Sequence, residues 1–182
     1  MLGTIDMKKI LACSVAAAFV LSGCSTIGDH PTERVGEARL NFANGLPAGT
    51  AQIISNGSTI SLAIAATGLE PGEHGFHLHT TGRCMAPDFK SAGGHLNPSG
   101  NAHGRLNPDG KHLGDLPNLL VGASRSASVE VDIGADTSEL RSNLFDADGT
   151  AIVIHAGADD YRSDPAGDAG ARVVCGVVKA AS

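Results

Sequence analysis

Two histidines, His77 and His79, lie in the short segment Gly-Phe-His-Leu-His and could supply two ligands to one metal ion. Residues two apart in an extended strand project from the same face, so both imidazoles would point the same way. His155 ends the apolar run 151–154 and could join them. Each signal alone is weak, because a polar strand face also explains a His-X-His pair and a lone histidine at a strand end is often structural.

A second group of potential ligands lies downstream in one glycine-rich stretch. Within 21 residues the sequence contains three histidines and one aspartate, namely His95, His103, His112 and Asp115. Three imidazoles and one carboxylate make a closed four-ligand zinc set. The alternative is a solvated polar loop with incidental histidines, and it fits poorly because leucines are interleaved with these residues.

The number of candidates, seven in all, constrains how metal ions could be held. Seven ligands are too many for one tetrahedral ion and one short of two separate four-ligand sites, so a shared ligand would resolve the mismatch. An imidazole can bridge two ions through its two nitrogens. A site of imidazoles alone suits copper, and one that includes a carboxylate suits zinc. The other two histidines, His30 and His74, are interpreted as bystanders, and His74 is the stronger candidate of the two for the site.

Eight short apolar or alternating runs, separated by turn residues, predict a β-sandwich or barrel. The alternation is clearest over residues 126–133, where Val129, Val131 and Ile133 share one face. A helical turn is expected only over residues 136–144. The predicted strands span residues 35–43, 50–55, 59–67, 75–80, 119–123, 126–133, 150–156 and 171–179.

Two long segments, 81–118 and 157–170, interrupt this strand pattern and are rich in Gly, Pro and Asp or His. Loops of this length inside a small domain are usually functional or disordered, and their ligand content favours function. The composition agrees with an all-β domain, because 24 Gly and 8 Pro would interrupt long helices. The formal charge of −6, with scattered Lys and Arg, excludes a nucleic-acid partner.

The first residues carry the features of an export signal. Lys8 and Lys9 precede an apolar run over residues 10–21, which is shorter than the roughly 20 residues that a membrane-spanning helix needs. We therefore expect a signal peptide over residues 1–23, with Met7 as an alternative start. Its removal changes the formal charge to −7, because two lysines and one aspartate are lost.

The signal peptide ends in Leu-Ser-Gly-Cys24, which resembles the lipobox of bacterial lipoproteins, in which the cysteine is acylated. A stray cysteine in an ordinary signal peptide is the alternative. Residues 24–33 are then a lipidated tether and residues 34–182 the folded domain. The chain is expected in the cell envelope or periplasm, anchored to a membrane through its lipid, and Ser25 favours the outer membrane.

Two cysteines remain in the mature domain, Cys84 and Cys175. An even pair in an oxidising compartment predicts a disulfide, which would contribute about 4 kcal/mol by closing a long loop. A thiolate metal site is the alternative, and it is disfavoured because no further cysteine lies nearby.

Several motifs resemble the copper/zinc superoxide dismutases, in particular the bacterial lipoprotein type, over residues 35–179. They are Gly-Phe-His-Leu-His, Ala-Gly-Gly-His-Leu-Asn-Pro, His103-Gly104, His112-Leu-Gly-Asp115-Leu, Ile154-His155 and Gly-Asp-Ala-Gly-Ala-Arg-Val-Val-Cys-Gly-Val-Val. The resemblance implies an eight-stranded Greek-key β-sandwich or flattened barrel with two long functional loops. It also implies one copper and one zinc ion per subunit, and it leaves a homodimer open.

The resemblance further implies a role for each candidate residue. Copper would be held by His77, His79, His95 and His155, and zinc by His95, His103, His112 and Asp115, with His95 as the bridge. Asp159 would accept hydrogen bonds from one histidine of each set, which we expect to be His79 and His103. Cys84 and Cys175 match the family's disulfide, and Arg172 matches its arginine above the copper.

The implied reaction is the dismutation of two superoxide anions and two protons to dioxygen and hydrogen peroxide, an antioxidant activity. Copper would carry the electron because zinc has no redox chemistry, and His95 and Arg172 would be catalytic. A copper carrier on the same fold would be favoured by loss of a copper ligand or of the arginine. A zinc-stabilised adhesion module would not need the first histidine set.

The charges of the loops predict weak steering of the anionic substrate. Arg162 is the only basic residue in 157–170, and the mature chain is negative, so the long-range field would repel superoxide. We therefore expect a weak dependence of the rate on salt. Arg83, just before Cys84, is expected to add positive potential at the rim of the copper site.

Overall fold

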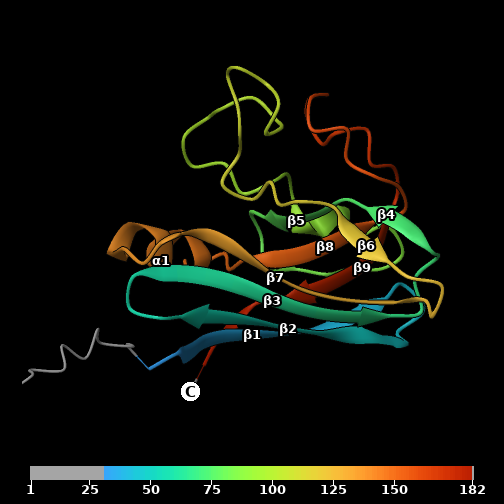
Figure 1. Cartoon of the computed structure of the whole chain (residues 1–182), viewed down its shortest axis with the longest axis horizontal. Helices are drawn as coiled ribbons and strands as arrows, with labels where there is room; N and C mark the ends of the chain where they lie inside the picture. The colour runs from blue at the N-terminus through green and yellow to red at the C-terminus, as the bar shows by residue number, and fades with distance from the viewer. Residues whose placement is uncertain (1–30, 182) are drawn as a thin grey trace, which may run out of the picture.

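Antiparallel strands curl into a flattened barrel beneath two long loops in a computed structural model, which describes residues 31–181 (Figure 1). The strand order is β5-β8-β9-β1-β2-β3-β7, with β10 beside β1, and β4 pairs separately with β6. The strands are β1 (Glu33–Phe42), β2 (Pro47–Ser55), β3 (Thr59–Thr67), β4 (Gly72–His74), β5 (Phe76–His79), β6 (Leu119–Val121), β7 (Ser126–Ala135), β8 (Ala151–His155), β9 (Arg172–Val177) and β10 (Lys179–Ala180). The predicted all-β fold class is confirmed.

Each of the eight predicted runs contains a strand, and one further strand, β4, lies just before the run predicted over 75–80. Gly75 separates β4 from β5. Its N–H donates to the carbonyl of Gly157 at 2.8 Å, and its own carbonyl accepts from the N–H of His155 at 2.8 Å. The backbone of Gly75 therefore bonds to the second long loop and to the end of β8, and β4 was missed because its three residues carry no apolar alternation.

The core lies between the curled faces of the sheet. Along β3, Ile60, Leu62 and Ile64 alternate with more exposed residues and are at most 2% exposed, as a strand with one buried face requires. Burial of each such side chain contributes about 1.5–3 kcal/mol. On β7, Ile133 is buried and Val131 packs against the core, whereas Val129 is 36% exposed, so the predicted face enters the core at one end only.

The predicted helical turn is α1 (Ser138–Leu144), and Thr137 caps it by accepting a hydrogen bond from the N–H of Leu140 at 3.1 Å. The short 3-10 helix η1 (Lys90–Ala92) was not expected, because a three-residue turn leaves no periodic pattern. No helix in residues 31–181 is long and apolar enough to cross a membrane. The predicted signal peptide, Cys24 and most of the tether lie outside the described residues.

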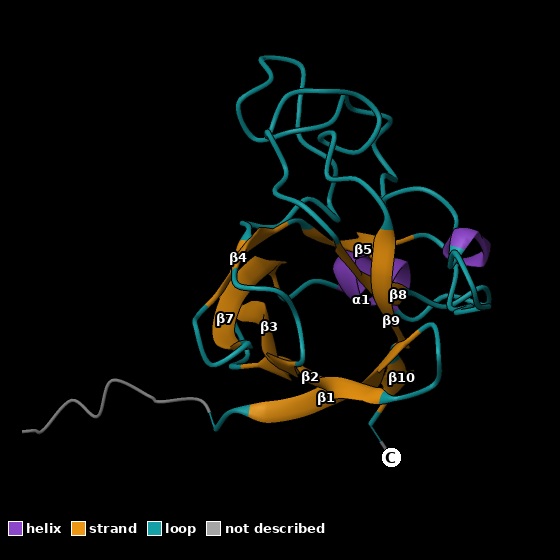
Figure 2. Ribbon diagram, turned by 90° about the vertical axis from the view of Figure 1, so that its right-hand side faces the viewer, coloured by secondary structure: helices purple, strands orange, loops and turns teal. Residues whose placement is uncertain are grey.

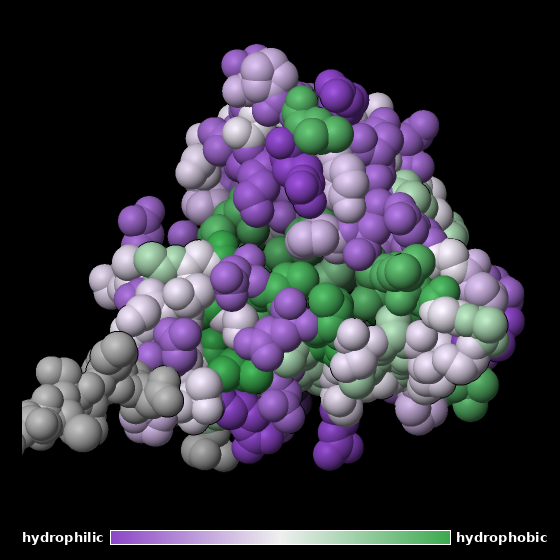
Figure 3. Space-filling model, in the orientation of Figure 1, coloured by the Kyte–Doolittle hydropathy of each residue, from purple (hydrophilic) through white to green (hydrophobic). Residues whose placement is uncertain are grey.

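The two long loops rise from the same end of the barrel, as the end-on view shows (Figure 2). Their surface is largely hydrophilic, and the apolar atoms visible from that side lie mostly below them (Figure 3). The barrel thus presents one end to the loops, and the predicted ligands meet there.

Candidate metal centre

Strands β5 and β8 place three imidazoles beneath the loops. His77 and His79 alternate along β5 with Phe76 and Leu78, whose side chains belong to the barrel core. Pairing of β5 with β8 brings His155 close, with its ring centroid 5.0 Å from that of His77. All three rings are buried.

The fourth imidazole, that of His95, comes from the first loop. Its backbone pairs with that of His79, and the next residue, Leu96, donates its N–H to the carbonyl of Leu78 at 2.8 Å. The His95 ring stacks on that of His77 with 3.9 Å between centroids. The loop therefore adds His95 to β5 as if it were one more strand residue.

Each of these four rings has one nitrogen with a neighbour and one without. His77 Nε2 lies 2.8 Å from Asp159, His79 Nδ1 donates to the Gly93 carbonyl at 3.0 Å, and His155 Nδ1 donates to the Gly170 carbonyl at 3.0 Å. Within residues 31–181, the buried side-chain nitrogen and oxygen atoms without a hydrogen-bond partner are His77 Nδ1, His79 Nε2, His95 Nε2 and His155 Nε2.

The same four histidines each offer one ligand atom, and these atoms lie within 4.8 Å of one another. Buried polar atoms are normally hydrogen-bonded, so four convergent exceptions need an explanation. Burial lowers the pKa of His77 and His155 to about 4 and the pKa of His79 to about 2. The rings are thus neutral at pH 7, with lone pairs free, as a metal ion requires. The donor set fits a copper ion.

A second set of atoms surrounds one oxygen of Asp115. The Nδ1 atoms of His95, His103 and His112 lie 2.8, 3.1 and 3.1 Å from Asp115 Oδ1. Four ligands at about 2.0–2.1 Å from a tetrahedral zinc ion would be separated by about 3.3 Å, close to these values. Asp115 Oδ2 accepts from the N–H groups of Gly104 at 2.9 Å and His112 at 3.0 Å, which leaves Oδ1 for the ion. This set fits zinc.

Asp159 links the two sets, but through a different histidine than expected. Its Oδ2 accepts from His77 Nε2 at 2.8 Å and its Oδ1 from His103 Nε2 at 3.0 Å. The expectation of His79 was wrong, because His79 lies at the far end of β5, where its Nδ1 bonds to Gly93. Burial alone would raise the pKa of Asp159, but the hydrogen bonds from His77 and His103 outweigh it and hold the pKa at about 2.

His74 is buried but belongs to neither ligand set. Its ring nitrogens lie 2.7 Å from the carbonyl of His155 and 2.8 Å from the carbonyl of Glu70. It therefore supports the backbone beneath a ligand, in agreement with its interpretation as a bystander to the metals. His30 lies outside the described residues.

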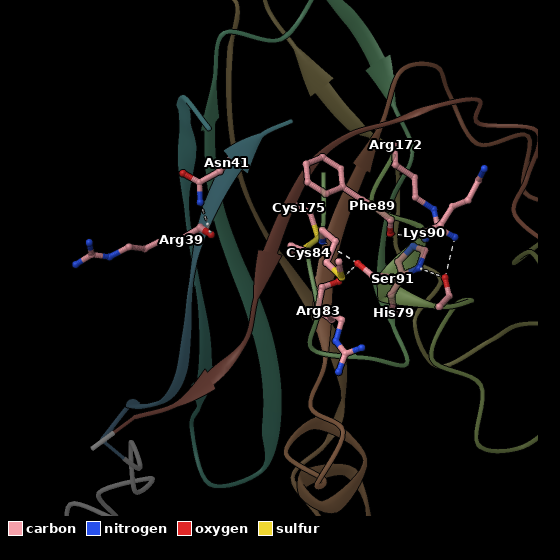
Figure 4. Close-up of a disulfide and its surroundings, with 12 residues drawn as sticks. Arg39, Asn41, His79, Arg83, Cys84, Phe89, Lys90, Ser91, Arg172 and Cys175 are labelled. Carbon is pink, nitrogen blue, oxygen red and sulfur yellow. Dashed lines mark hydrogen bonds between the residues drawn. A yellow bond between two sulfur atoms is a disulfide. The ribbon is translucent and has the colours of Figure 1, made fainter. Parts of the chain in front are cut away.

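Arg172 lines a surface pocket of about 380 Å³ at this end of the barrel. Its Nη1 donates to the carbonyl of Phe89 at 2.9 Å and its Nη2 to the carbonyl of Gly93 at 2.7 Å (Figure 4). The Gly93 carbonyl also accepts from His79, so the guanidinium is fixed relative to one of the four imidazoles. A held guanidinium beside a solvent-accessible pocket is suited to binding a small anion.

Lys90, rather than Arg83, shares that pocket. Figure 4 draws Arg83 on the opposite side of the disulfide from Arg172, so the structure does not support its expected place at the rim. Lys90 was missed by sequence reasoning, although it is the only basic residue between Cys84 and His95. Its Nζ lies 3.1 Å from Asp88 Oδ2, and both side chains are well exposed.

The predicted disulfide joins Cys84 to Cys175, which are 91 residues apart. Cys175 is buried on β9, next to the strand that ends in His155. Cys84 belongs to the loop that carries Phe89. The covalent link therefore fastens to the barrel the segment whose carbonyl holds Arg172.

Known proteins similar to this chain are copper/zinc superoxide dismutases. A family model described as copper/zinc superoxide dismutase matches residues 47–178. The chain is 44% identical over 145 residues to superoxide dismutase [Cu-Zn] 2 of Aquifex aeolicus, which covers 78% of this chain and 85% of the relative. It is 37% identical over 174 residues to superoxide dismutase [Cu-Zn] of Caulobacter vibrioides, covering 93% and 100%.

Among solved structures, the crystal structure of a SOD-like protein from Bacillus subtilis resembles this one with a TM-score of 0.73 at 40% identity. The match covers 78% of this chain and 96% of that one. Similarity of fold does not by itself give function, which depends on the residues at the site. In this chain both metal-ligand sets and the adjacent arginine are complete.

Proposed function

The chain belongs to the copper/zinc superoxide dismutase family and is a superoxide dismutase that uses copper and zinc, and on that premise we propose how its own residues perform the reaction. His77, His79, His95 and His155 hold copper, and His95, His103, His112 and Asp115 hold zinc. His95 would contribute to both sites, because its Nε2 has no hydrogen-bond partner in the described residues and its Nδ1 lies 2.8 Å from Asp115 Oδ1. The observation that carries this assignment is the convergence of four buried nitrogens without partners in the part of the chain that the structure describes.

The overall reaction converts two superoxide anions and two protons to dioxygen and hydrogen peroxide. Copper supplies the one-electron redox chemistry, whereas zinc, which has none, holds the loop ligands together. Arg172 binds the anion with a guanidinium that Phe89 and Gly93 keep in place. His95 Nε2, a buried nitrogen without a hydrogen-bond partner in the described residues, would carry one of the two protons when copper does not occupy it, and solvent would supply the other.

A metal-ligand variant tests the assignment of the copper site. We expect His155→Ala to contain zinc but little copper and to lose dismutase activity by about a hundredfold or more. Metal content by elemental analysis and activity on the same samples measure both. Full activity in this variant, or a wild-type protein that takes up no copper, would contradict the proposal.

Substitution of Arg172, with Arg162 as a matched control, distinguishes an enzyme from a copper carrier. Arg172→Ala is expected to keep both metals and lose about tenfold in activity, because an anion-binding group beside the reacting atoms is removed. Arg162→Ala, in the exposed part of the second loop, is expected to keep the wild-type rate. Copper-loaded protein without dismutase activity would favour a carrier.

We also propose that the chain is exported and held at the outer membrane by lipid on Cys24, as part of antioxidant defence in the cell envelope. The support is the sequence Leu-Ser-Gly-Cys24 after an apolar run that follows two lysines. Stable anchoring requires more than one acyl chain, as a lipoprotein cysteine provides. Mass spectrometry of the mature N-terminus and fractionation of Cys24→Ser test it, and wild-type protein found only in soluble fractions would contradict it.

A further inference from the structure

The backbone of Asp159 is held from both sides by one side chain, that of Asn118. Asn118 Oδ1 accepts from the N–H of Asp159 at 2.9 Å, and Asn118 Nδ2 donates to the carbonyl of Asp159 at 3.0 Å. Asn118 follows the zinc ligand Asp115 by three residues, whereas Asp159 belongs to the other loop. A single amide therefore joins the two loops at the residue that contacts both metal-ligand sets.

Tyr161 adds a second link between the same residues. Its N–H donates to Asp159 Oδ1 at 2.6 Å, and its hydroxyl accepts from the N–H of Asn118 at 2.7 Å. Tyr161 has a φ of 62°, which is rarely adopted by a bulky residue and is held only by strong surroundings. Those surroundings are the first loop, since the Tyr161 carbonyl accepts from Leu106 at 3.1 Å and Arg105 stacks over the ring at 5.3 Å.

We propose that Asn118 and Tyr161 are positioning residues that hold the carboxylate of Asp159 between the two metal-ligand sets. The assignment of copper and zinc to those sets rests on the proposed function. The carboxylate accepts from Nε2 of His77 and Nε2 of His103, and it thereby keeps the proton of each ring on Nε2. Nδ1 of both rings is then left for the metal ions.

The hydrogen bonds that Asn118 and Tyr161 make with Asp159 also couple the second loop to the first. A cation that ordered residues 95–115 would also order Asn118 and, through Asp159, the orientation of His77. Asp159 has no strand to position it, because it lies between β8 and β9 in the second loop. Without the hydrogen bonds from Asn118 and Tyr161, only the hydrogen bonds from His77 and His103 would hold the buried carboxylate of Asp159 in place.

The test uses full-length protein loaded with zinc alone, and it follows the imidazole N–H protons by nuclear magnetic resonance with nitrogen-labelled histidine. In the wild type, the Nε2 protons of His77 and His103 are expected to exchange slowly with water, because both are buried and hydrogen-bonded. In Asn118→Ala we expect the His77 proton to exchange about tenfold faster and the zinc affinity to fall about tenfold. Tyr161→Phe, which removes only the hydroxyl, is expected to change both in the same direction by less.

Asn101→Ala is the matched control. Asn101 lies in the same loop and its side chain donates to the Lys111 carbonyl at 2.9 Å, but within residues 31–181 it makes no hydrogen bond to Asp159. Its His77 signal should equal that of the wild type. An unchanged His77 signal in Tyr161→Phe and in folded Asn118→Ala, or an equal change in Asn101→Ala, would overturn the proposal, as would a loss of zinc affinity without any change at His77.

These measurements are independent of dismutation, because no copper is present. A wild-type protein with slowly exchanging His77 and His103 protons but no activity after copper loading would refute the proposed function and leave the positioning role in place. Should Asn118→Ala fail to fold, Tyr161→Phe alone decides, since the ring and its contact with Arg105 remain.

Discussion

The two ligand sets share His95 yet are built in opposite ways. In the set assigned to copper, His77, His79 and His155 belong to the strands β5 and β8, and His95 pairs with β5 through its backbone. In the set assigned to zinc, all four residues come from the loop 81–118, and no strand contributes. The barrel holds one set in place, whereas the other set and its loop depend on each other.

The hydrogen bonds reveal the same contrast. The strand histidines His79 and His155 donate to the backbone carbonyls of Gly93 and Gly170, so their rings are oriented by the protein itself. The loop atoms instead crowd around Asp115 Oδ1, and a cation there would replace mutual repulsion with bonds. The geometry of the copper ligands is therefore set mainly by the barrel, whereas the order of the first loop is expected to depend on zinc.

The largest expected effect follows from removing the zinc site. Asp115→Asn should lose zinc and with it about 4 kcal/mol of stabilisation at a free zinc concentration a thousand times Kd. Amide hydrogen exchange should accelerate across residues 95–115 and remain slow in β8. Thermal unfolding with and without zinc, together with exchange measured by mass spectrometry, checks this.

Asp109→Asn is the control, because Asp109 is an exposed carboxylate of the same loop outside the ligand set. It should bind zinc as the wild type does. Equal acceleration in β8 and in the loop of Asp115→Asn would break the contrast between the two sets.

A smaller effect is expected at the contact between the loops. Gly167 has a φ of 67°, and a Cβ added there would lie 1.8 Å from Asp159 Oδ1 and 2.7 Å from His103 Nε2. Gly100 has nearly the same φ, 66°, but a Cβ there meets nothing within 4 Å. Gly100→Ala should lower the free energy of unfolding by about 1 kcal/mol, from backbone strain alone.

Gly167→Ala should lower the free energy of unfolding by about 3 kcal/mol, since overpacking adds to strain, and it should also weaken zinc binding. Denaturant titrations of the two zinc-loaded variants measure the difference. Equal losses in both variants would mean that Gly167 is needed only for its backbone conformation.

How far the sequence predicts this molecule depends on whether a feature is local. Strand periodicity identified the barrel, and the spacing of His77 and His79 predicted that both rings share a face, as they do. The even pair of cysteines in a domain expected to be exported also predicted the disulfide between Cys84 and Cys175, which is confirmed. The assignment of each distant ligand to copper or to zinc needed the family resemblance.

The errors arose where two segments meet without a periodic pattern. Whether Asp159 faces His77 or His79 depends on which end of β5 the second loop covers, and both histidines look alike in the sequence. Lys90 enters the Arg172 pocket because η1 turns the chain there, and a three-residue turn leaves no sequence signal. Asn118 gave no signal either, since its role depends on one amide reaching another loop.

The barrel has an acid-sensitive contact of its own, which sharpens the comparison in metal-free protein. Asp136 accepts from Arg141 Nε at 2.6 Å and Nη2 at 2.7 Å, and Ser55 also donates to it. The hydrogen bonds from Arg141 and then Ser55 lower the pKa of Asp136 to about 2. Since the folded-state pKa is below the unfolded value of about 3.9, this contact stabilises above pH 4 and is lost as pH falls toward 2.

Metal-free wild type should therefore lose stability over that range more steeply than Asp136→Asn. Asp132→Asn, which alters an exposed carboxylate on β7, is the control and should retain the wild-type slope. Denaturant unfolding at successive pH values gives the slopes. Identical slopes for Asp136→Asn and the wild type would show that other groups set the acid sensitivity of the barrel.

The smallest effect concerns the exposed pair beside Arg172, where the loop meets the substrate. Lys90 adds a positive charge to the pocket, but Asp88 lies 3.1 Å from it and offsets that charge. We expect Lys90→Gln to lower the rate about twofold at low ionic strength and Asp88→Asn to raise it about as much, because steering by single exposed charges is modest. Both differences should vanish above physiological salt, where the Debye length is below about 8 Å.

Lys179→Gln makes the same change of net charge on β10, outside this pocket, and should leave the rate unchanged. Rates measured by pulse radiolysis across a salt series decide: an equal effect of Lys179→Gln would assign steering to net charge rather than to the loop.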